Sequence, residues 1–216
     1  MQNPLKYKSF YKRRLPHIQP LDAVFFITYR LNFEYSNDVI NHFNMKHDEF
    51  VKLVSQTLKE KRKQKSDELY KILFDIEDSF LSKIKSHKWL MNDKIAEIIK
   101  ESLFFRNETE YELICFCIMP NHVHILIKPL VEKENIPYSL SSIIHDHKRF
   151  TAKECNKLLN RLGAFWYPDF YDHYIRDEDE FHNVINYILQ NPVKAGLVED
   201  WKDWKYSWVY ENVISL

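Results

Sequence analysis

Residues 113–128, Leu-Ile-Cys-Phe-Cys-Ile-Met-Pro-Asn-His-Val-His-Ile-Leu-Ile-Lys, form two apolar runs on either side of a short break. A continuous apolar run of this length predicts a central strand that is buried on both faces. Pro120-Asn121 in the break predicts a tight turn. The two runs are therefore expected to pair as a hairpin, and this hairpin is the best-defined architectural element of the sequence.

Further elements are predicted on both sides of the hairpin. Residues 23–31 are rich in β-branched and aromatic side chains, which predicts a buried strand. Apolar residues recur at helical spacing in 37–107, where proline and glycine are absent, and in 139–161. A last helix is expected over 178–190, with Asp177 as its N-cap and Pro192 forcing its end. A short extended segment is expected near 173–175.

Composition limits the classes of protein that this chain can be. The 216 residues are 45% apolar and 15% aromatic, which excludes wholesale disorder and predicts a single domain over 1–216. Two glycines are too few for a dinucleotide-binding or phosphate-binding glycine loop. Thirty-one basic and 31 acidic residues cancel, so a polyanion would have to be held by local patches. Without a membrane span or a signal-peptide pattern, we expect a cytoplasmic protein.

Two histidines share one face of the second hairpin strand. Strand side chains alternate, so Val123, Ile125 and Ile127 should face the core, while His122 and His124 point to the opposite side. Two imidazoles spaced in this way are able to bind one cation, and neutral imidazole is a common metal ligand. The alternative interpretation is a pair of ordinary surface histidines beside a turn.

The last predicted helix carries polar residues along one edge of its apolar stripe. Asn183, Tyr187 and Asn191 follow one another at four-residue steps, which places Tyr187 where it leans over the sheet. Tyr187 is alternatively an aromatic residue at the edge of the core, and Asn191 a helix C-cap. Periodicity alone does not bring this edge to the histidines.

These residues carry a resemblance to a known family. Residues 119–127, Met-Pro-Asn-His-Val-His-Ile-Leu-Ile, resemble the motif of single-tyrosine HUH transposases, in which two histidines flank a bulky hydrophobic residue. Residues 187–198, Tyr-Ile-Leu-Gln-Asn-Pro-Val-Lys-Ala-Gly-Leu-Val, resemble the tyrosine motif of the REP-associated subgroup. The segments 148–153, 171–178 and 204–207 are similar to that subgroup as well. The stretch 37–107 is longer than the family leads us to expect, and we interpret it as a helical insertion.

The resemblance implies a fold and a reaction. We expect an α/β (α+β) sandwich of four or five mainly antiparallel strands with helices on one face, in a ferredoxin-like or RNA-recognition-like topology. The open face would carry the histidines and take the DNA. The implied enzyme is a transposase or nickase that cleaves and rejoins single-stranded DNA at hairpins or repeated palindromes, acting as a monomer or homodimer. Its Tyr187 would form a covalent 5′-phosphotyrosine and so preserve the energy of the bond for rejoining.

The resemblance also implies a metal ion. Mg²⁺, or Mn²⁺, would be held by His122, His124 and Asn191 and would polarise the scissile phosphate. Asparagine is shorter than the glutamine that related transposases often have, and Gln190 is the alternative ligand.

Basic residues and aromatic residues suggest where DNA would be contacted. Cations interleaved with rings suit single strands, because bases stack on the rings. The residues that we expect to contact DNA are Lys148, Arg149, Lys153, Arg13, Arg14 and Trp166. For Trp166, core packing is an equally good interpretation.

Two other functions fit parts of the sequence. Cys115 and Cys117 lie on the strand that pairs with His122 and His124, so a zinc-binding module is conceivable, although a cysteine within an apolar strand usually behaves as a small hydrophobe. A non-catalytic, domesticated DNA-binding protein of the same fold is the second alternative.

Overall fold

The computed structural model describes residues 7–12, 16–35, 74–76, 78–84, 86–133 and 136–214, together with positions 37, 39, 41, 45, 49 and 52. The chain divides into two compact units. Unit 1 comprises Met1–Asn32 and His87–Leu216, and unit 2 comprises Phe33–Ser86. Among the described residues, no helix combines the length and the apolar character needed to cross a membrane.

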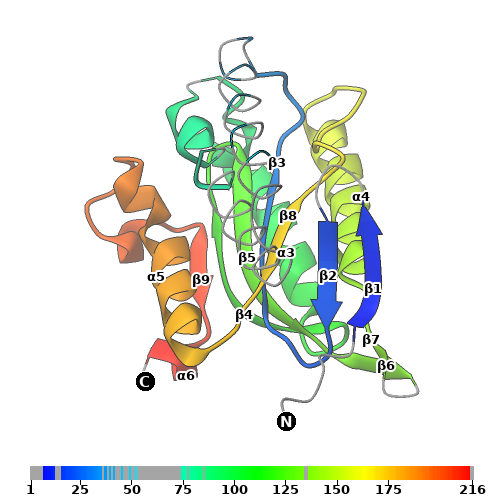
Figure 1. Cartoon of the computed structure of the whole chain (residues 1–216). Coiled ribbons are helices and arrows are strands. Elements are labelled where there is room, and N and C mark those ends of the chain that lie inside the picture. The colour runs from blue at the N-terminus through cyan, green and yellow to red at the C-terminus, as the bar shows by residue number, and fades with distance from the viewer. Residues whose placement is uncertain are drawn as a thin grey trace. The chain divides into compact units, whose positions relative to one another are not determined.

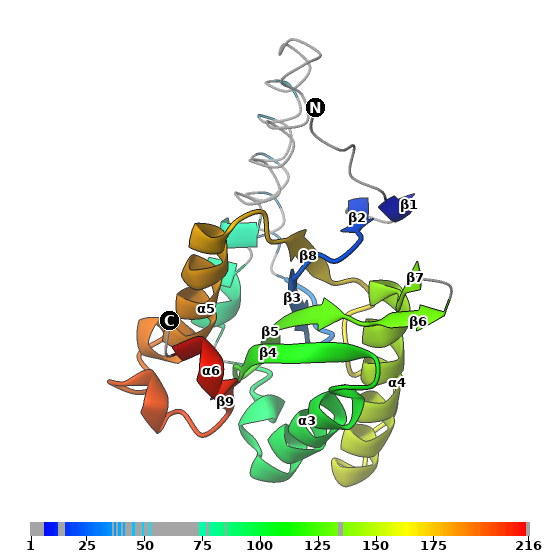
Figure 2. The same cartoon turned by 90° about the horizontal axis from the view of Figure 1, so that it is seen from below.

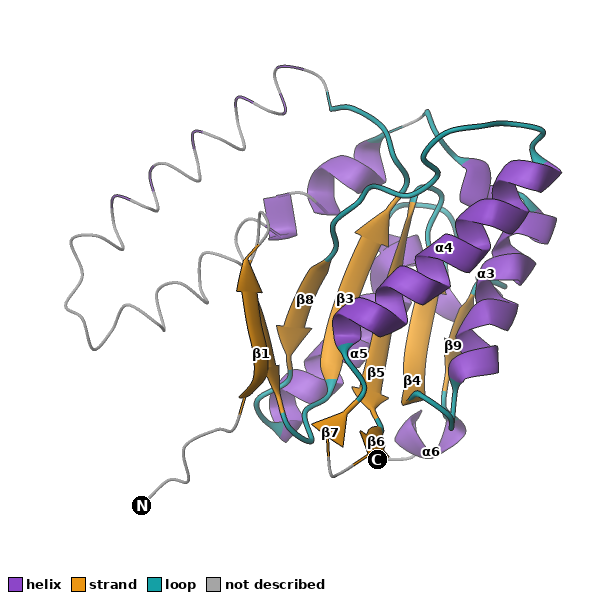
Figure 3. Cartoon of the chain, turned by 90° about the vertical axis from the view of Figure 1, so that its right-hand side faces the viewer, coloured by secondary structure: helices purple, strands orange, loops and turns teal. Residues whose placement is uncertain are grey.

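The centre of unit 1 is a five-stranded sheet in which every pair of neighbours is antiparallel (Figures 1 and 3). Its strand order is β8-β3-β5-β4-β9. The strands are β3 (Phe25–Arg30), β4 (Tyr111–Ile118), β5 (His122–Pro129), β8 (Tyr171–Tyr174) and β9 (Ser207–Val209).

The remaining elements of unit 1 are helices, short 3-10 turns and two small strand pairs. The helical elements are η2 (Trp89–Met91), α3 (Asp93–Arg106), α4 (Leu140–Leu158), α5 (Glu178–Lys194), η3 (Trp201–Asp203) and α6 (Glu211–Ile214). The small pairs are β1 (Tyr7–Lys12) with β2 (Pro16–Pro20), and β6 (Val131–Lys133) with β7 (Ile136–Pro137).

The predicted fold class is confirmed. Along the chain, β3-α3-β4-β5-α4-β8 is a split β-α-β repeat, and its four strands lie in the order β8-β3-β5-β4, which is the ferredoxin-like arrangement. The predicted hairpin is the pair β4–β5, and its turn at 119–121 is closed by a hydrogen bond from Met119 N to His122 O of 2.9 Å.

The helices differ from the prediction, because they cover both faces of the sheet. Figure 2 shows α3 and α4 on one side of the sheet and α5 on the other. The side chains of β3 follow the same division: Tyr29 reaches His147 of α4, whereas the ring of Phe26 lies 5.8 Å from that of Tyr187 of α5. Successive residues of a strand point to opposite faces, so β3 has to be apolar on both.

The end of α5 also differs from the prediction. The helix continues through Pro192 to Lys194 and is closed by backbone bonds from Ala195 N to Asn191 O and from Leu197 N to Pro192 O, each 2.9 Å. Asn191 and Pro192 are both buried. Proline removes only one intrahelical bond so close to a helix end, and the packing of its buried ring holds the last turn in place.

Unit 2 is helical wherever it is described beyond residue 35, apart from the loop residues 84 and 86. Its buried residues include Phe74 and Leu81. The insertion expected over 37–107 overlaps unit 2 only in residues 37–86, because α3 belongs to unit 1. The organisation as one domain with this insertion stays a prediction.

A buried polar network joins β3 to the helices of the first face. The Tyr29 hydroxyl lies 2.7 Å from His147 Nε2, and Ser102 Oγ lies 3.0 Å from His147 Nδ1. Arg106 donates to the same Ser102 Oγ over 2.9 Å. Burial first, and then the positive charges of Arg106 and Lys148, lower the pKa of the His147 imidazole to about 3. Burial raises the pKa of the Tyr29 phenol, so this hydrogen bond joins a neutral phenol to a neutral imidazole.

This network predicts a pH-dependent stability. The pKa of His147 is lowered from 6.5 on folding, so its contribution is complete above that pH and is lost as the pH falls toward 3. Between about pH 6.5 and about pH 5, the wild-type protein is expected to lose about 2 kcal/mol more free energy of unfolding than His147→Gln. Urea unfolding at the two pH values measures the difference. His145→Gln, on the exposed side of the same helix, should behave as wild type. Equal losses in wild type and His147→Gln would contradict the assignment.

Candidate active site

The two histidines of β5 lie in the middle of the sheet, on the face that α5 covers. His122 is paired across the sheet with Arg30, and His124 with Thr28. Both histidines are buried, with exposed fractions of 1% and 0%. The sequence led us to expect them on an open face, so this detail of the prediction is wrong. The apolar residues Val123 and Ile125 point to the other face, as the alternation predicts.

Neighbouring polar groups orient both rings. Asn121 Oδ1 accepts a hydrogen bond from His122 Nδ1 over 2.6 Å, and Thr28 Oγ1 lies 2.8 Å from His124 Nδ1. An amide oxygen only accepts, so the proton of His122 sits on Nδ1 and the lone pair on Nε2. A hydroxyl also accepts, so Thr28 is able to hold His124 in the same tautomer. Such outer hydrogen bonds fix the orientation of metal-binding imidazoles.

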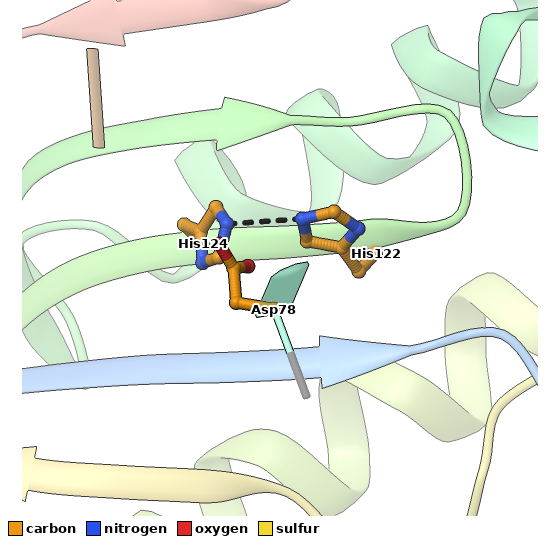
Figure 4. Close-up of side chains that lie close together, drawn as sticks. All are labelled: Asp78, His122 and His124. Atoms are coloured by element: carbon orange, nitrogen blue, oxygen red, sulfur yellow. Dashed lines mark hydrogen bonds between the residues drawn. The ribbon is translucent and has the colours of Figure 1, made fainter. Parts of the chain in front are cut away.

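The two Nε2 atoms are separated by 3.0 Å (Figure 4). Suppose that two nitrogen atoms each lie ~2.1 Å from the same ion. They are ~3.0 Å apart if the angle between them at the ion is a right angle, and ~3.4 Å apart if that angle is tetrahedral. The spacing therefore fits two neighbouring ligands of an octahedral divalent ion such as Mg²⁺ or Mn²⁺. Figure 4 also labels Asp78, which belongs to unit 2, whereas both histidines belong to unit 1.

The cysteines do not join this pair. Cys117 is the cross-strand partner of His124, but its sulfur lies 3.6 Å from Met119 Sδ, inside the hydrophobic core. Within the described part of the chain, neither Cys115 nor Cys117 forms a group with the two histidines whose ligand atoms all lie within 4.8 Å of one another. This geometry gives no support to a zinc module with two cysteines and two histidines.

Tyr187 comes to the same place from α5. The centroid of its ring lies 5.7 Å from that of His124 and 5.8 Å from that of Phe26, and the residue is only partly buried. Lys194, two turns further along the helix, places its ammonium 4.8 Å from the centroid of the Tyr187 ring. A half-exposed phenol therefore lies directly beside one of the two imidazoles.

The start of α5 explains why Tyr187 is held there. Asp177 Oδ1 accepts from Glu180 N over 2.8 Å, as an N-cap does. The Glu180 carboxylate then reaches back over 2.8 Å both to Arg176 N and to His173 Nε2 of β8. This carboxylate fastens the first turn of the helix to the edge strand of the sheet.

Asn191 follows Tyr187 by one helical turn and is buried, with 4% exposed. Its amide Nδ2 donates to the carbonyl oxygen of Tyr187 over 2.9 Å. That bond uses the amide nitrogen, so Oδ1 is the atom of this side chain that suits a cation. Gln190 is half-buried on the neighbouring position of the helix.

The residues expected to contact DNA fall into four groups. Lys148 donates to the carbonyl oxygens of Tyr167, Pro168 and Asp169 at 2.6, 3.1 and 3.1 Å, which occupies its three N–H groups within the protein. Trp166 is 5% exposed and donates from Nε1 to Thr151 Oγ1, as core packing predicts. Arg149 and Lys153 are exposed on α4, across the sheet from the histidines. Arg13 and Arg14 lie outside the described residues.

Two residues of the site, Thr28 and Asn121, are not predicted from the sequence. Thr28 is a single hydroxyl residue between aromatic and aliphatic neighbours in β3, and that break in an apolar run is the signal that it left. Asn121 was assigned only to the turn. Neither is connected to a histidine ring until the register of β3 against β5 is known.

Thr28→Val tests the assignment of these rings to a metal site. The substitution keeps the shape of the side chain and removes the hydroxyl beside His124 Nδ1, so the affinity for Mn²⁺ is expected to fall ~10-fold or more. Titration of free Mn²⁺ by electron paramagnetic resonance measures it. Thr109→Val, whose hydroxyl donates to Arg106 O at a loop, is the matched control and should bind as wild type. Unchanged affinity in Thr28→Val would remove Thr28 from the site.

Comparison with known proteins finds similar chains among the transposases. A Haemophilus influenzae protein with the provisional name of REP-associated tyrosine transposase is 33% identical over 108 residues, covering 48% of this chain and 61% of that protein. The REP-associated tyrosine transposase of Escherichia coli is 28% identical over 108 residues, covering 50% and 60% of the two chains. The matched part therefore spans about three fifths of these relatives. A solved structure, described as the REP-associated tyrosine transposase bound to a REP hairpin, aligns with a TM-score of 0.49 and 18% identity over 92% of this chain and 81% of that one.

The family profile described as "Transposase IS200 like" matches residues 80–191, which is slightly more than half of the chain. The matched segment contains β4, β5, α4 and the part of α5 that carries Tyr187. With two oriented imidazoles and a tyrosine side by side within that segment, the chain belongs to the IS200-like transposase family.

Proposed function

We propose that this protein is a metal-dependent transposase or nickase that cleaves and rejoins single-stranded DNA through a covalent 5′-phosphotyrosine. The observation that carries the proposal is the position of the Tyr187 ring, 5.7 Å from the ring of His124. Membership of the transposase family and the names of the two curated relatives support it.

In the proposed reaction the Tyr187 hydroxyl attacks a backbone phosphorus. The Oη–P bond forms while the P–O3′ bond breaks, the phenol loses its proton and the departing 3′-oxygen takes one up. The fragment on the 3′ side of the cut stays on the enzyme through its 5′-phosphate, the other fragment leaves with a free 3′-hydroxyl, and a different 3′-hydroxyl later reverses the step. A phosphodiester bond is replaced by another of the same kind, so rejoining needs no nucleotide cofactor.

We assign the metal ligands to His122, His124 and Asn191. A bound Mg²⁺ or Mn²⁺ would supply Lewis-acid polarisation of the scissile phosphate. Asn121 and Thr28 hydrogen-bond to the other ring nitrogens, so both imidazoles are able to present an Nε2 lone pair to the ion. Tyr187 is partly exposed and lies beside His124. We expect its hydroxyl to contact a DNA strand that runs along the face of the sheet on which α5 lies.

For the DNA itself we propose a single strand with hairpin or palindromic structure, in the cytoplasm, bound by a monomer or homodimer. The names of the curated relatives support the link to repeated palindromes. Arg149, Lys153, Arg13 and Arg14 stay in the proposed set of phosphate contacts. We leave out Lys148, whose ammonium is held by carbonyl oxygens, and Trp166, which is buried in the core.

Tyr187→Phe tests the reaction. Incubation of wild-type protein with hairpin-bearing single-stranded DNA and Mn²⁺ is expected to give a covalent adduct that runs as a shifted band in denaturing gels, and Tyr187→Phe should give none. Tyr210→Phe, at a half-exposed tyrosine outside the site, should form the adduct normally. His122→Ala and His124→Ala should abolish metal-dependent cleavage while remaining folded. Binding by wild type without an adduct, on a panel of such substrates, would support the non-catalytic DNA-binding alternative instead.

The third ligand is tested by comparing two neighbouring amides. Asn191→Ala is expected to weaken Mn²⁺ binding ~10-fold, because one oxygen ligand is lost, whereas Gln190→Ala should bind as wild type. Isothermal titration with Mn²⁺ in the absence of DNA measures both. The reverse pattern would transfer the ligand role to Gln190, and no effect in either variant would exclude both amides.

A further inference from the structure

Arg30 occupies an unusual place for an arginine. It ends β3 on the same face as Thr28, is only 7% exposed, and its Cα is paired directly with that of His122. Side chains at directly opposite positions of antiparallel strands have Cβ atoms ~5 Å apart. The positively charged side chain of Arg30 therefore lies within the sheet, next to the proposed metal ligand His122.

The guanidinium of Arg30 is held in one orientation. Its Cζ lies 3.9 Å from the centroid of the Tyr167 ring, and Nη1 donates to the carbonyl oxygen of Leu31 over 3.1 Å. Tyr167 is on the other side of β3, where its N–H donates to Arg30 O over 2.9 Å. Tyr167, Arg30 and His122 therefore form a row across one face of the sheet.

Lys148 supports this row from the opposite side of the sheet. Its ammonium binds the carbonyl oxygens of Tyr167, Pro168 and Asp169 and so fixes the loop that carries the Tyr167 ring. A surface loop would normally leave such carbonyls to water. Here the Lys148 side chain of α4 holds the loop backbone in place, and the loop positions the Tyr167 ring against which the Arg30 guanidinium stacks.

We propose that Arg30 binds a phosphate of the DNA strand at the site, immediately beside the position of the metal. This inference rests on the proposed function and adds a substrate contact to it. Guanidinium presents a planar set of donors that matches two phosphate oxygens, and a stacked guanidinium loses less entropy when it makes these bonds. Arg30 lies directly opposite His122 on the neighbouring strand, so a phosphate at the proposed metal position beside His122 lies within reach of the Arg30 side chain.

The experiment measures DNA binding in the Tyr187→Phe background, where no covalent step interferes. Affinity for a hairpin-bearing single strand is measured by fluorescence anisotropy at several salt concentrations. Loss of one phosphate contact in Arg30→Gln should lower the slope of log K against log salt by ~0.7 and reduce the affinity at low salt ~10-fold. Lys100→Gln, which removes a charge from α3 whose side chain is 40% exposed, should leave both unchanged. An unchanged slope and affinity in folded Arg30→Gln overturns the inference.

A second pair of variants leaves Arg30 itself intact. Tyr167→Leu removes the ring beneath the guanidinium and should weaken DNA binding several-fold, while Tyr167→Phe keeps the ring and should bind as the parent protein does. Equal binding by the two variants contradicts the proposed row. The adduct assay with Tyr187 intact tests the proposed function independently. If the adduct forms but the Arg30 and Tyr167 variants bind DNA as the parent protein does, only the role of Arg30 is contradicted.

Discussion

The register of β3 against β5 is the constraint on which the rest of the site depends. It sets Thr28 opposite His124 and Arg30 opposite His122. A slip by one residue would turn every side chain of one strand to the other face and would bury the histidines against α3 and α4. The register is held by large apolar side chains of the same strands, such as Ile27 and Ile125, which have exposed fractions of 0% and 1%. Hydrophobic packing on one face therefore positions the polar groups of the other.

The side chains on the two faces of β3 have different roles. On the first face, Tyr29 hydrogen-bonds to His147 and joins the strand to α4. On the second, Thr28 and Arg30 stand beside the histidines. A functional group on a central strand is held more firmly than one on a loop, because its backbone is bonded on both sides. Tyr187 and Asn191 come from α5, the helix that covers this second face, and the Glu180 carboxylate ties that helix to β8.

The errors of the sequence analysis have identifiable causes. The helix was expected to stop before Pro192 because proline disfavours the preceding helical residue, but a buried proline ring near the end of α5 costs one bond and gains packing. Residue type predicts a DNA contact for Lys148, and for Trp166 it predicts either a DNA contact or core packing. Residue type does not show that α4 covers the face of the sheet remote from the histidines, nor that three carbonyl oxygens surround the Lys148 ammonium.

The sequence by itself determined the β4–β5 hairpin, the separation of His122 and His124 from Val123 and Ile125, and the N-cap of α5 at Asp177. Each follows from local rules, namely alternation along a strand and capping at a helix start. Only the tertiary structure decided that Tyr187 lies beside His124, that Thr28 and Asn121 orient the rings, and that Arg30 lies opposite His122. These relations join residues far apart along the chain. Strand register and helix docking set them, and both depend on packing of the whole core rather than on any local pattern.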